Sequence, residues 1–150
     1  MELNDLAATE TLARRIAELA RPSDVIALSG GLGTGKTCFA RAFIRARLDA
    51  PALDVPSPTF TLVQHYDGAV PIAHFDLYRI DDANEVYELG LDDALDDGIT
   101  LIEWSERAGG DALPRERLTV TFAMTPEAGR RRVTLAGWPD RLAAIAEAAR

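Results

Sequence analysis

Residues 25–37 read Val-Ile-Ala-Leu-Ser-Gly-Gly-Leu-Gly-Thr-Gly-Lys-Thr, and this stretch decides the fold. Val25 to Leu28 form a short, continuous apolar run, which is typical of a strand buried in a parallel sheet. A glycine-rich turn follows, and after it Phe39, Phe43 and Ala46 recur at helical spacing. The sequence therefore predicts a strand, a tight turn and an amphipathic helix in direct succession.

The turn at residues 30–37 matches the pattern G-x-x-x-x-G-K-[ST] at every required position. Glycines at these places let backbone N–H groups point inward around phosphate oxygens, and the following helix directs the positive end of its dipole at them. Lys36 would reach the β- and γ-phosphates of ATP, and the Thr37 hydroxyl would bind Mg²⁺. Cys38 also suits a small buried filler on the helix. Nucleotide contacts are predicted at Gly31, Leu32, Gly33, Thr34, Gly35, Lys36, Thr37 and Cys38.

Length and composition predict one globular domain over residues 1–150. The chain has 47% hydrophobic and 27% charged residues, and its formal net charge is −8. Such an acidic balance argues against broad contact with nucleic acid or anionic lipid, because those surfaces need a basic face. The single cysteine excludes an internal disulfide. With neither a signal-peptide pattern nor an apolar run near the ~20 residues of a membrane span, a cytoplasmic protein is expected.

The remaining pattern predicts an α/β fold of the P-loop NTPase-like type, with three layers and a mixed, mainly parallel central sheet. A β-hairpin is expected where Asp67-Gly68 joins two strand-like runs. Asp82 and Glu85 resemble a capping box that opens a helix ending at Gly90. Further helices are expected over about Thr9–Ala20 and around Leu142, Ile145 and Ala149, and further strands over 61–66, 70–76, 99–102, 118–124 and 132–136.

Two carboxylates follow apolar strands and are candidates for work on the metal and the attacking water. Glu103 comes directly after the run 99–102, where a parallel strand delivers an acid to the nucleotide edge of the sheet. Asp76 closes the run 72–76 and shares a strand face with His74, which is either a site residue or a satisfied, partly buried side chain. The predicted catalytic set is Lys36, Asp76, Glu103 and Trp104, and the predicted metal ligands are Thr37 and Glu103.

Two charge runs remain open to more than one interpretation. Residues 81–97 hold eight carboxylates and no lysine or arginine, which fits a solvated helix face or a docking surface for a basic partner. Arg130, Arg131 and Arg132 precede a strand, and one of them is expected to meet the phosphates or the adenine. Arg132 is taken as that nucleotide contact.

Four blocks of sequence resemble the TsaE (YjeE) family over nearly the whole chain. They are the phosphate loop, Ser57-Pro58-Thr59-Phe60-Thr61-Leu62, His74-Phe75-Asp76-Leu77-Tyr78-Arg79 and Leu101-Ile102-Glu103-Trp104. The resemblance implies a bacterial P-loop ATPase required to make threonylcarbamoyladenosine in tRNA, partnering TsaD and TsaB, with tRNA reached only through that complex. It also implies a switch-like loop at 57–61 and adenine contacts at Asp5 and Leu6.

Three rival functions are considered. A small-molecule kinase would need an arginine-rich lid, and no such segment is visible between Thr37 and Glu103. A GTP-binding switch would need an Asn-Lys-x-Asp segment, which the sequence lacks. A nucleotide-gated adaptor that turns ATP over only inside a complex differs from an ATPase mainly in rate, and slow, partner-stimulated hydrolysis is expected.

Overall fold

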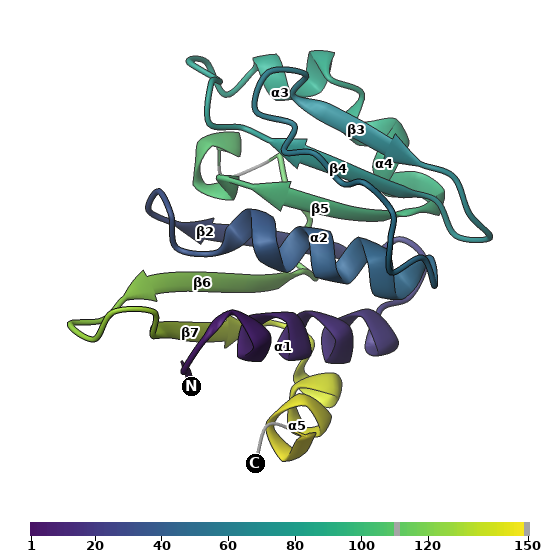
Figure 1. Ribbon diagram of the computed structural model, residues 1–150. Coiled ribbons are helices and arrows are strands. Elements are labelled where there is room, and N and C mark those ends of the chain that lie inside the picture. The colour runs from purple at the N-terminus through teal and green to yellow at the C-terminus, as the bar shows by residue number, and fades with distance from the viewer. Residues whose placement is uncertain (110–111, 149–150) are drawn as a thin grey trace.

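The computed structural model describes residues 1–109 and 112–148. Within these residues, seven strands form one sheet in the order β1-β7-β6-β2-β5-β4-β3 (Figure 1). The strands are β1 (Glu2–Leu3), β2 (Val25–Gly30), β3 (Val63–Tyr66), β4 (Ile72–Asp76), β5 (Ile99–Glu103), β6 (Leu118–Met124) and β7 (Arg131–Ala136). The helices are α1 (Leu6–Leu19), α2 (Lys36–Arg47), α3 (Glu85–Glu88), α4 (Leu91–Asp97), α5 (Pro139–Ala148) and the short 3₁₀ helix η1 (Ser105–Ala108).

The centre of the sheet is parallel and its edges are antiparallel. Strand β2 pairs in parallel with both β5 and β6, and β4 pairs in parallel with β5. The pairs β1–β7, β6–β7 and β3–β4 are antiparallel, so the predicted mixed sheet and the β-hairpin are confirmed. Because parallel strands end at the same edge, β2, β4 and β5 deliver the glycine-rich turn, Asp76 and Glu103 to one place.

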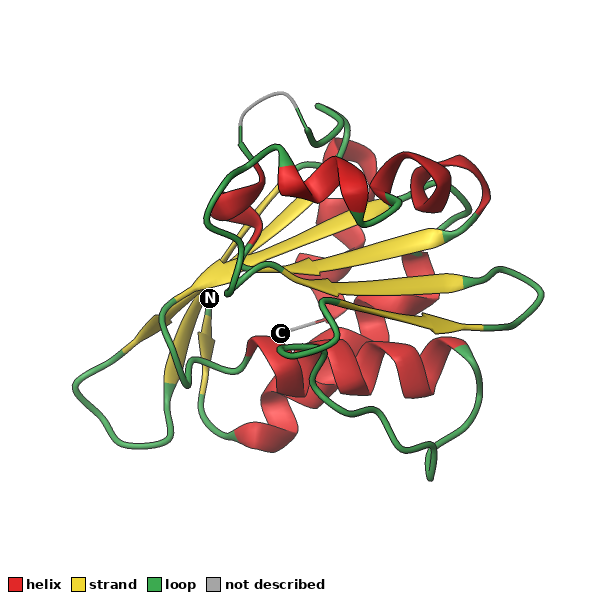
Figure 2. Cartoon of the chain, turned by 90° about the horizontal axis from the view of Figure 1, so that it is seen from above, coloured by secondary structure: helices red, strands yellow, loops and turns green. Residues whose placement is uncertain are grey.

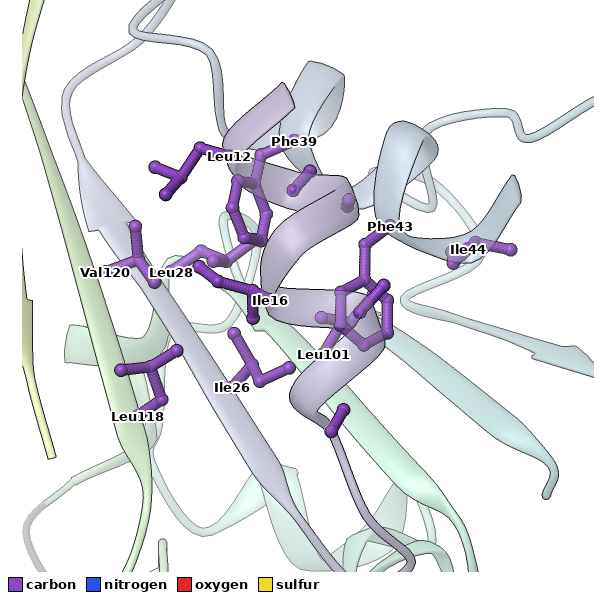
Figure 3. Close-up of a cluster of buried hydrophobic side chains, with 14 of the residues drawn as sticks. Leu12, Ile16, Ile26, Leu28, Phe39, Phe43, Ile44, Leu101, Leu118 and Val120 are labelled. Carbon is purple, nitrogen blue, oxygen red and sulfur yellow. The ribbon is translucent and has the colours of Figure 1, made fainter. Parts of the chain in front are cut away.

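Helices cover both faces of the sheet and make the predicted three layers (Figure 2). The helices α1, α2 and α5 pack on one face, and α3, α4 and η1 lie over the other. The larger core joins α1 and α2 to the central strands through Leu12, Ile16, Ile26, Leu28, Phe39, Phe43 and Leu101 (Figure 3). The smaller core joins the other face to α3 and α4 through Val25, Ala27, Phe75, Val86, Leu91 and Ile102. Strands β2 and β5 are therefore buried on both faces, which accounts for their mainly apolar sequences.

Helix α1 begins three residues earlier than the apolar spacing suggests. The carboxylate of Asp5 accepts a hydrogen bond of 2.8 Å from the backbone N–H of Ala8, so Asp5 is the N-cap. Leu6 starts the helix with its side chain 62% exposed and adds nothing to the apolar stripe. Periodicity marks where a helix is buried, whereas the cap marks where it begins.

Two local predictions are corrected by the structure. The hairpin pairs Tyr66 with Ile72, so its connection runs over residues 67–71 and is longer than a two-residue Asp-Gly turn. Pro71 has no N–H to extend the ladder, and its carbonyl instead accepts from Ile99. Helix α3 ends at Glu88, just before Gly90 as predicted, but Gly90 in its left-handed conformation is also the N-cap of a second helix, α4, which the pattern did not predict.

The two ends of the chain add elements that the pattern did not resolve. Strand β1 is only two residues long and extends the sheet beside β7, which is too short a run to show alternation. Helix α5 is present as predicted, with Ile145 buried, while Ala149 lies outside the described residues. No helix in the described part of the chain is both long and apolar enough to cross a membrane.

Candidate functional site

The glycine-rich turn connects β2 to α2 and needs glycine at two positions for steric reasons. Gly30 has φ = 134°, and a Cβ at this position would collide with the carbonyl oxygen of Phe122. Gly35 has φ = 112° and is the N-cap of α2. Both backbones lie in the left-handed region, where other residues are strained. The turn therefore leads directly into the first helical residues, Lys36 and Thr37.

A pocket of about 350 Å³ lies over this turn at the carboxyl edge of the parallel strands. The pocket brings together all four predicted catalytic residues and most of the predicted nucleotide contacts. The residues that line it are Leu32, Gly33, Thr34, Gly35, Lys36, Thr37, Cys38, Thr59, Asp76, Tyr78, Glu103 and Trp104.

Lys36 is held by the turn and by an aromatic ring. Its Nζ donates hydrogen bonds of 2.7 Å and 2.6 Å to the carbonyls of Gly30 and Gly31. The same ammonium lies 4.1 Å from the centroid of the Trp104 ring, within the range of a cation–π contact. Burial lowers the pKa of Lys36, although Glu103, Glu106 and Asp76 oppose the shift. The site thus keeps a cation in a partly dehydrated place, where its attraction to phosphate oxygens is strengthened.

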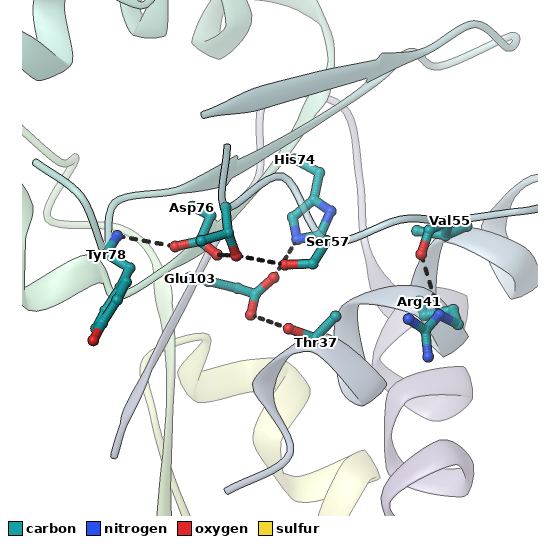
Figure 4. Close-up of polar contacts among 9 residues, drawn as sticks. Thr37, Arg41, Val55, Ser57, His74, Asp76, Tyr78 and Glu103 are labelled. Atoms are coloured by element: carbon teal, nitrogen blue, oxygen red, sulfur yellow. Dashed lines mark hydrogen bonds and ion pairs between the residues drawn. The ribbon is translucent and has the colours of Figure 1, made fainter. Parts of the chain in front are cut away.

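Glu103 joins three elements at the floor of the pocket (Figure 4). Its Oε1 accepts a hydrogen bond of 2.7 Å from the Thr37 hydroxyl, and its Oε2 lies 2.6 Å from Nε2 of His74. Glu103 and His74 are only 1% and 0% exposed. The Thr37 hydroxyl donates its hydrogen bond to Glu103, so the lone pairs of the hydroxyl oxygen are free for a metal ion. These oxygens are the kind of ligand that Mg²⁺ prefers.

Asp76 ends β4 beside Glu103, its register partner on β5. Its Oδ2 accepts a hydrogen bond of 3.0 Å from the Thr59 hydroxyl, and its Oδ1 accepts one of 2.9 Å from the backbone N–H of Tyr78. The Thr59 hydroxyl lies 2.8 Å from that of Ser57. Asp76 therefore ties the loop that precedes β3 to the edge of the pocket.

Two arginines of α2 hold the beginning of this loop. Nε of Arg41 donates to the carbonyl of Val55 at 3.2 Å (Figure 4), and Nε of Arg45 donates to that of Leu53 at 2.8 Å. Beyond Val55 the loop carries Phe60, whose side chain is 81% exposed. The loop is thus anchored on α2 at one end and on Asp76 near the other.

Trp104 follows Glu103 with a backbone φ of 56°, which turns the chain from β5 into η1. Its ring packs against Tyr78 with the ring centroids 4.9 Å apart, on the same edge as Lys36. The sequence interpretation missed Tyr78 as a lining residue. The available signal was its place two residues after Asp76 in the His74–Arg79 block.

The structure places Arg131, and not Arg132, at the phosphate loop. Arg131 Nη2 donates a hydrogen bond of 3.1 Å to the carbonyl of Gly33. Neither arginine is among the residues that line the pocket, and Arg132 forms an exposed ion pair with Glu2 at 3.5 Å. Adjacent residues of a strand point to opposite faces, so only one of the two can turn toward the loop. Arg130 pairs with Glu127 at 2.9 Å.

Asp5 and Leu6 also lie outside the lining of the pocket over the glycine-rich turn. Asp5 caps α1, whereas Leu6 lines a second pocket of about 440 Å³ between α1 and α2. Cys38 lines both pockets, so the two adjoin at the first turn of α2. Burial raises the pKa of the Cys38 thiol, which keeps it protonated and suits it to a lining role.

A buried parallel strand, a glycine-rich turn of this spacing and a helix that opens with lysine and threonine define the P-loop class of α/β folds. The family model described as "Threonylcarbamoyl adenosine biosynthesis protein TsaE" matches residues 3–145. The chain belongs to the TsaE family, and the resemblance noted in its sequence is confirmed.

Relatives and a solved structure agree with this assignment. The tRNA threonylcarbamoyladenosine biosynthesis protein TsaE of Rickettsia felis is 42% identical over 105 residues, which cover 69% of this chain and 61% of the relative. The protein of the same name from Bacillus subtilis is 40% identical over 116 residues, or 76% and 70% of the two chains. The chain thus spans about three fifths of the Rickettsia felis relative. The crystal structure of Bacillus subtilis YdiB matches with a TM-score of 0.77 and 29% identity, over 99% of this chain and 91% of that one.

Proposed function

We propose that the chain is a Mg²⁺-dependent subunit that binds and hydrolyses ATP. In this proposal it acts in the cytoplasm with TsaD-like and TsaB-like partners to modify tRNA with threonylcarbamoyladenosine. The observation that carries the ATPase part is the contact between Thr37 and Glu103, 2.7 Å long, beside the ammonium of Lys36. A cation and a hydroxyl with free lone pairs at the start of α2, beside a buried carboxylate at the end of β5, form a set of groups suited to a phosphate–metal pair.

The residues present fit both groups that the proposal requires. The N–H groups of Gly33, Gly35 and their neighbours would surround the phosphates, and Lys36 would exchange its two carbonyl contacts for phosphate oxygens. Thr37 and Glu103 would hold Mg²⁺ directly or through water. The metal supplies neutralisation of the charge that develops on the phosphoryl oxygens.

Asp76 and Trp104 are assigned supporting parts in hydrolysis. Asp76 lies on the same edge as Glu103 and faces the pocket, so its carboxylate can orient the attacking water. Trp104 packs over the ammonium of Lys36 and limits where that cation can move. Both side chains therefore act on the reacting end of the nucleotide.

The second pocket extends the proposal to the rest of the nucleotide. It adjoins the pocket over the glycine-rich turn, which we call the phosphate pocket, at Cys38. Its lining also includes Leu6, the first residue of α1. An apolar side chain and a neutral thiol suit the flat face of a base. Leu6 and Cys38 are accordingly assigned to the base and ribose, while Asp5 contributes by capping the helix that presents Leu6.

The charge of the chain supports an indirect relation to tRNA. A formal net charge of −8 disfavours direct binding of a polyanion, whereas protein partners can supply a basic surface. The proposal therefore assigns this chain to nucleotide turnover and to docking on its partners. Slow hydrolysis by the isolated chain follows if the partners complete the site.

Reconstitution tests the proposal. The purified chain is mixed with TsaD-like and TsaB-like proteins, unmodified tRNA and an activated threonylcarbamoyl donor. Modified nucleoside, ATP hydrolysis and co-purification are measured with and without ATP. We expect modification to need the chain, and hydrolysis to rise when the partners are present. Modification that proceeds equally well without the chain would refute the tRNA role, and partner-stimulated binding without any hydrolysis would reduce it to an adaptor.

A further inference from the structure

His74 lies in the middle of β4, is fully buried, and makes one polar contact in the described part of the chain. Its Nε2 is 2.6 Å from Oε2 of Glu103, and its Nδ1 is buried without a hydrogen-bond partner there (Figure 4). The imidazole does not line the phosphate pocket. Its contact with the site therefore passes through Glu103.

The direction of this contact follows from the chemistry of its two groups. An ionised carboxylate only accepts hydrogen bonds, so the hydrogen of this contact is on Nε2 of His74, and the Nε2–H group donates a hydrogen bond to Oε2 of Glu103. The donated N–H also compensates part of the cost of burying the carboxylate. A ring nitrogen occupied in this way cannot bind a metal ion. The other nitrogen, Nδ1, belongs to a fully buried side chain that does not line the pocket. His74 is accordingly neither a ligand nor a base for the nucleotide.

What the imidazole does control is the rotation of the Glu103 carboxylate. The terminal torsion of a glutamate is broad, so without a partner on Oε2 the carboxylate plane could turn away from Thr37. Thr37 contacts one oxygen of the Glu103 carboxylate and His74 contacts the other, so each contact helps to keep the other in place. His74 and Glu103 come from neighbouring parallel strands, whose ladder fixes the spacing of their backbones.

We propose that His74 is a positioning residue that holds Oε1 of Glu103 against Thr37 and so sets the affinity of the site for Mg²⁺. The inference rests on the proposed function, because it takes Thr37 and Glu103 as the metal-binding pair. Hydrogen-bond partners of metal ligands commonly change metal affinity about 10- to 100-fold when they are removed. An effect of that size is expected here.

The test compares two substitutions at this position. His74→Phe keeps a ring of similar size but removes the donor, whereas His74→Gln keeps an amide N–H near the position of Nε2. His65→Phe is the matched control, because His65 is an exposed histidine on the adjacent strand β3 and lies opposite Ala73. If His74→Phe melts too low for measurement, His74→Asn replaces it, since the shorter amide does not reach Glu103.

The main readout is equilibrium binding of a fluorescent ATP analogue at increasing Mg²⁺ and in EDTA, with the melting temperature recorded alongside. Mg²⁺ should tighten binding of the ATP analogue, and we expect His74→Phe to raise the Mg²⁺ concentration at which half of this effect is reached about 10- to 100-fold. The affinity for the analogue in EDTA should stay near that of wild type. His74→Gln should recover most of the loss.

Two outcomes would overturn the inference. One is an unchanged Mg²⁺ requirement in His74→Phe. The other is a parallel fall of both affinities with the melting temperature and no recovery by glutamine, which is the mark of a core residue. A wild-type protein that binds nucleotide without any influence of Mg²⁺ would instead refute the metal part of the proposed function, and the inference with it.

Discussion

The hydroxyl of Thr59 donates a hydrogen bond of 3.0 Å to Oδ2 of Asp76, across 17 positions of the chain. This contact links the loop before β3 to the carboxylate that ends β4. A movement of Asp76 toward a bound phosphate or water would therefore also move the loop. Because Arg41 of α2 holds the carbonyl of Val55, this movement is confined to the part of the loop that follows Val55.

We expect this loop to respond to the γ-phosphate. The residues of the segment 56–61 that carry an amide proton, which excludes Pro56 and Pro58, should exchange it more slowly with a non-hydrolysable ATP analogue than with ADP or without nucleotide. The reason is that γ-phosphate and Mg²⁺ order loops of this kind. Hydrogen–deuterium exchange with the TsaD-like partner present measures it. Thr59→Val, which removes the hydroxyl and keeps the shape of the side chain, should reduce the difference in exchange rate between these nucleotide states. Equal protection in all three states together with unchanged partner affinity would rule out the switch.

Lys36→Ala should abolish productive ATP binding without unfolding the chain. Loss of two charge-assisted hydrogen bonds to phosphate costs at least about 3 kcal/mol, or roughly 100-fold in affinity. The removal of a partly desolvated ammonium offsets the loss of its hydrogen bonds to the carbonyls of Gly30 and Gly31, so the variant should stay folded with a melting temperature only slightly lowered. Calorimetric titration and thermal melting check both halves. Wild-type affinity and hydrolysis at an unchanged melting temperature would show that the P-loop assignment is wrong.

Asp76→Ala and Glu103→Ala should lower turnover more than they lower ATP affinity. Both carboxylates are assigned to the metal or the attacking water and not to the body of the nucleotide, so kcat should fall by about 100-fold. Steady-state hydrolysis with the partners present, beside direct binding, separates the two quantities. Asp81→Ala is the control, since that carboxylate is exposed and lies outside the pocket lining. Normal turnover in both variants would remove these acids from the site.

Arg131→Ala should weaken ATP binding, and Arg132→Ala should leave it nearly unchanged. The first substitution frees the Gly33 carbonyl from a hydrogen bond with a charged donor, worth roughly 1.5 kcal/mol to the shape of the turn. If the turn needs this bond to keep the shape that binds ATP, the loss of affinity is at most about tenfold. The second breaks only an exposed ion pair with Glu2, of a kind that contributes about 0–1 kcal/mol to stability. Side-by-side titrations with ATP compare the two variants, and an equal loss of affinity in both would refute a role for the contact between Arg131 and Gly33.

The sequence alone was sufficient for the features that depend on local spacing. The strand–turn–helix around Lys36 and the acids that follow β4 and β5 could be predicted, because each is a short pattern with one steric or electrostatic cause. Parallel strands end at one edge, so the meeting of Asp76, Glu103 and Lys36 also followed from their positions in the chain. The family resemblance added the loop at 57–61.

The tertiary structure decided the pairings between segments that are far apart in the chain. Which arginine reaches Gly33 depends on the register of β7 against β6, and a slip of one residue would exchange Arg131 for Arg132. Whether His74 is packing or part of the site depends on the register of β4 against β5, which pairs His74 with Leu101 and leaves its side chain within hydrogen-bond distance of Glu103, two residues further along β5. Apolar periodicity records which side of an element is buried, but it carries no information about the partner across the interface. That partner is selected only when strands and helices pack together.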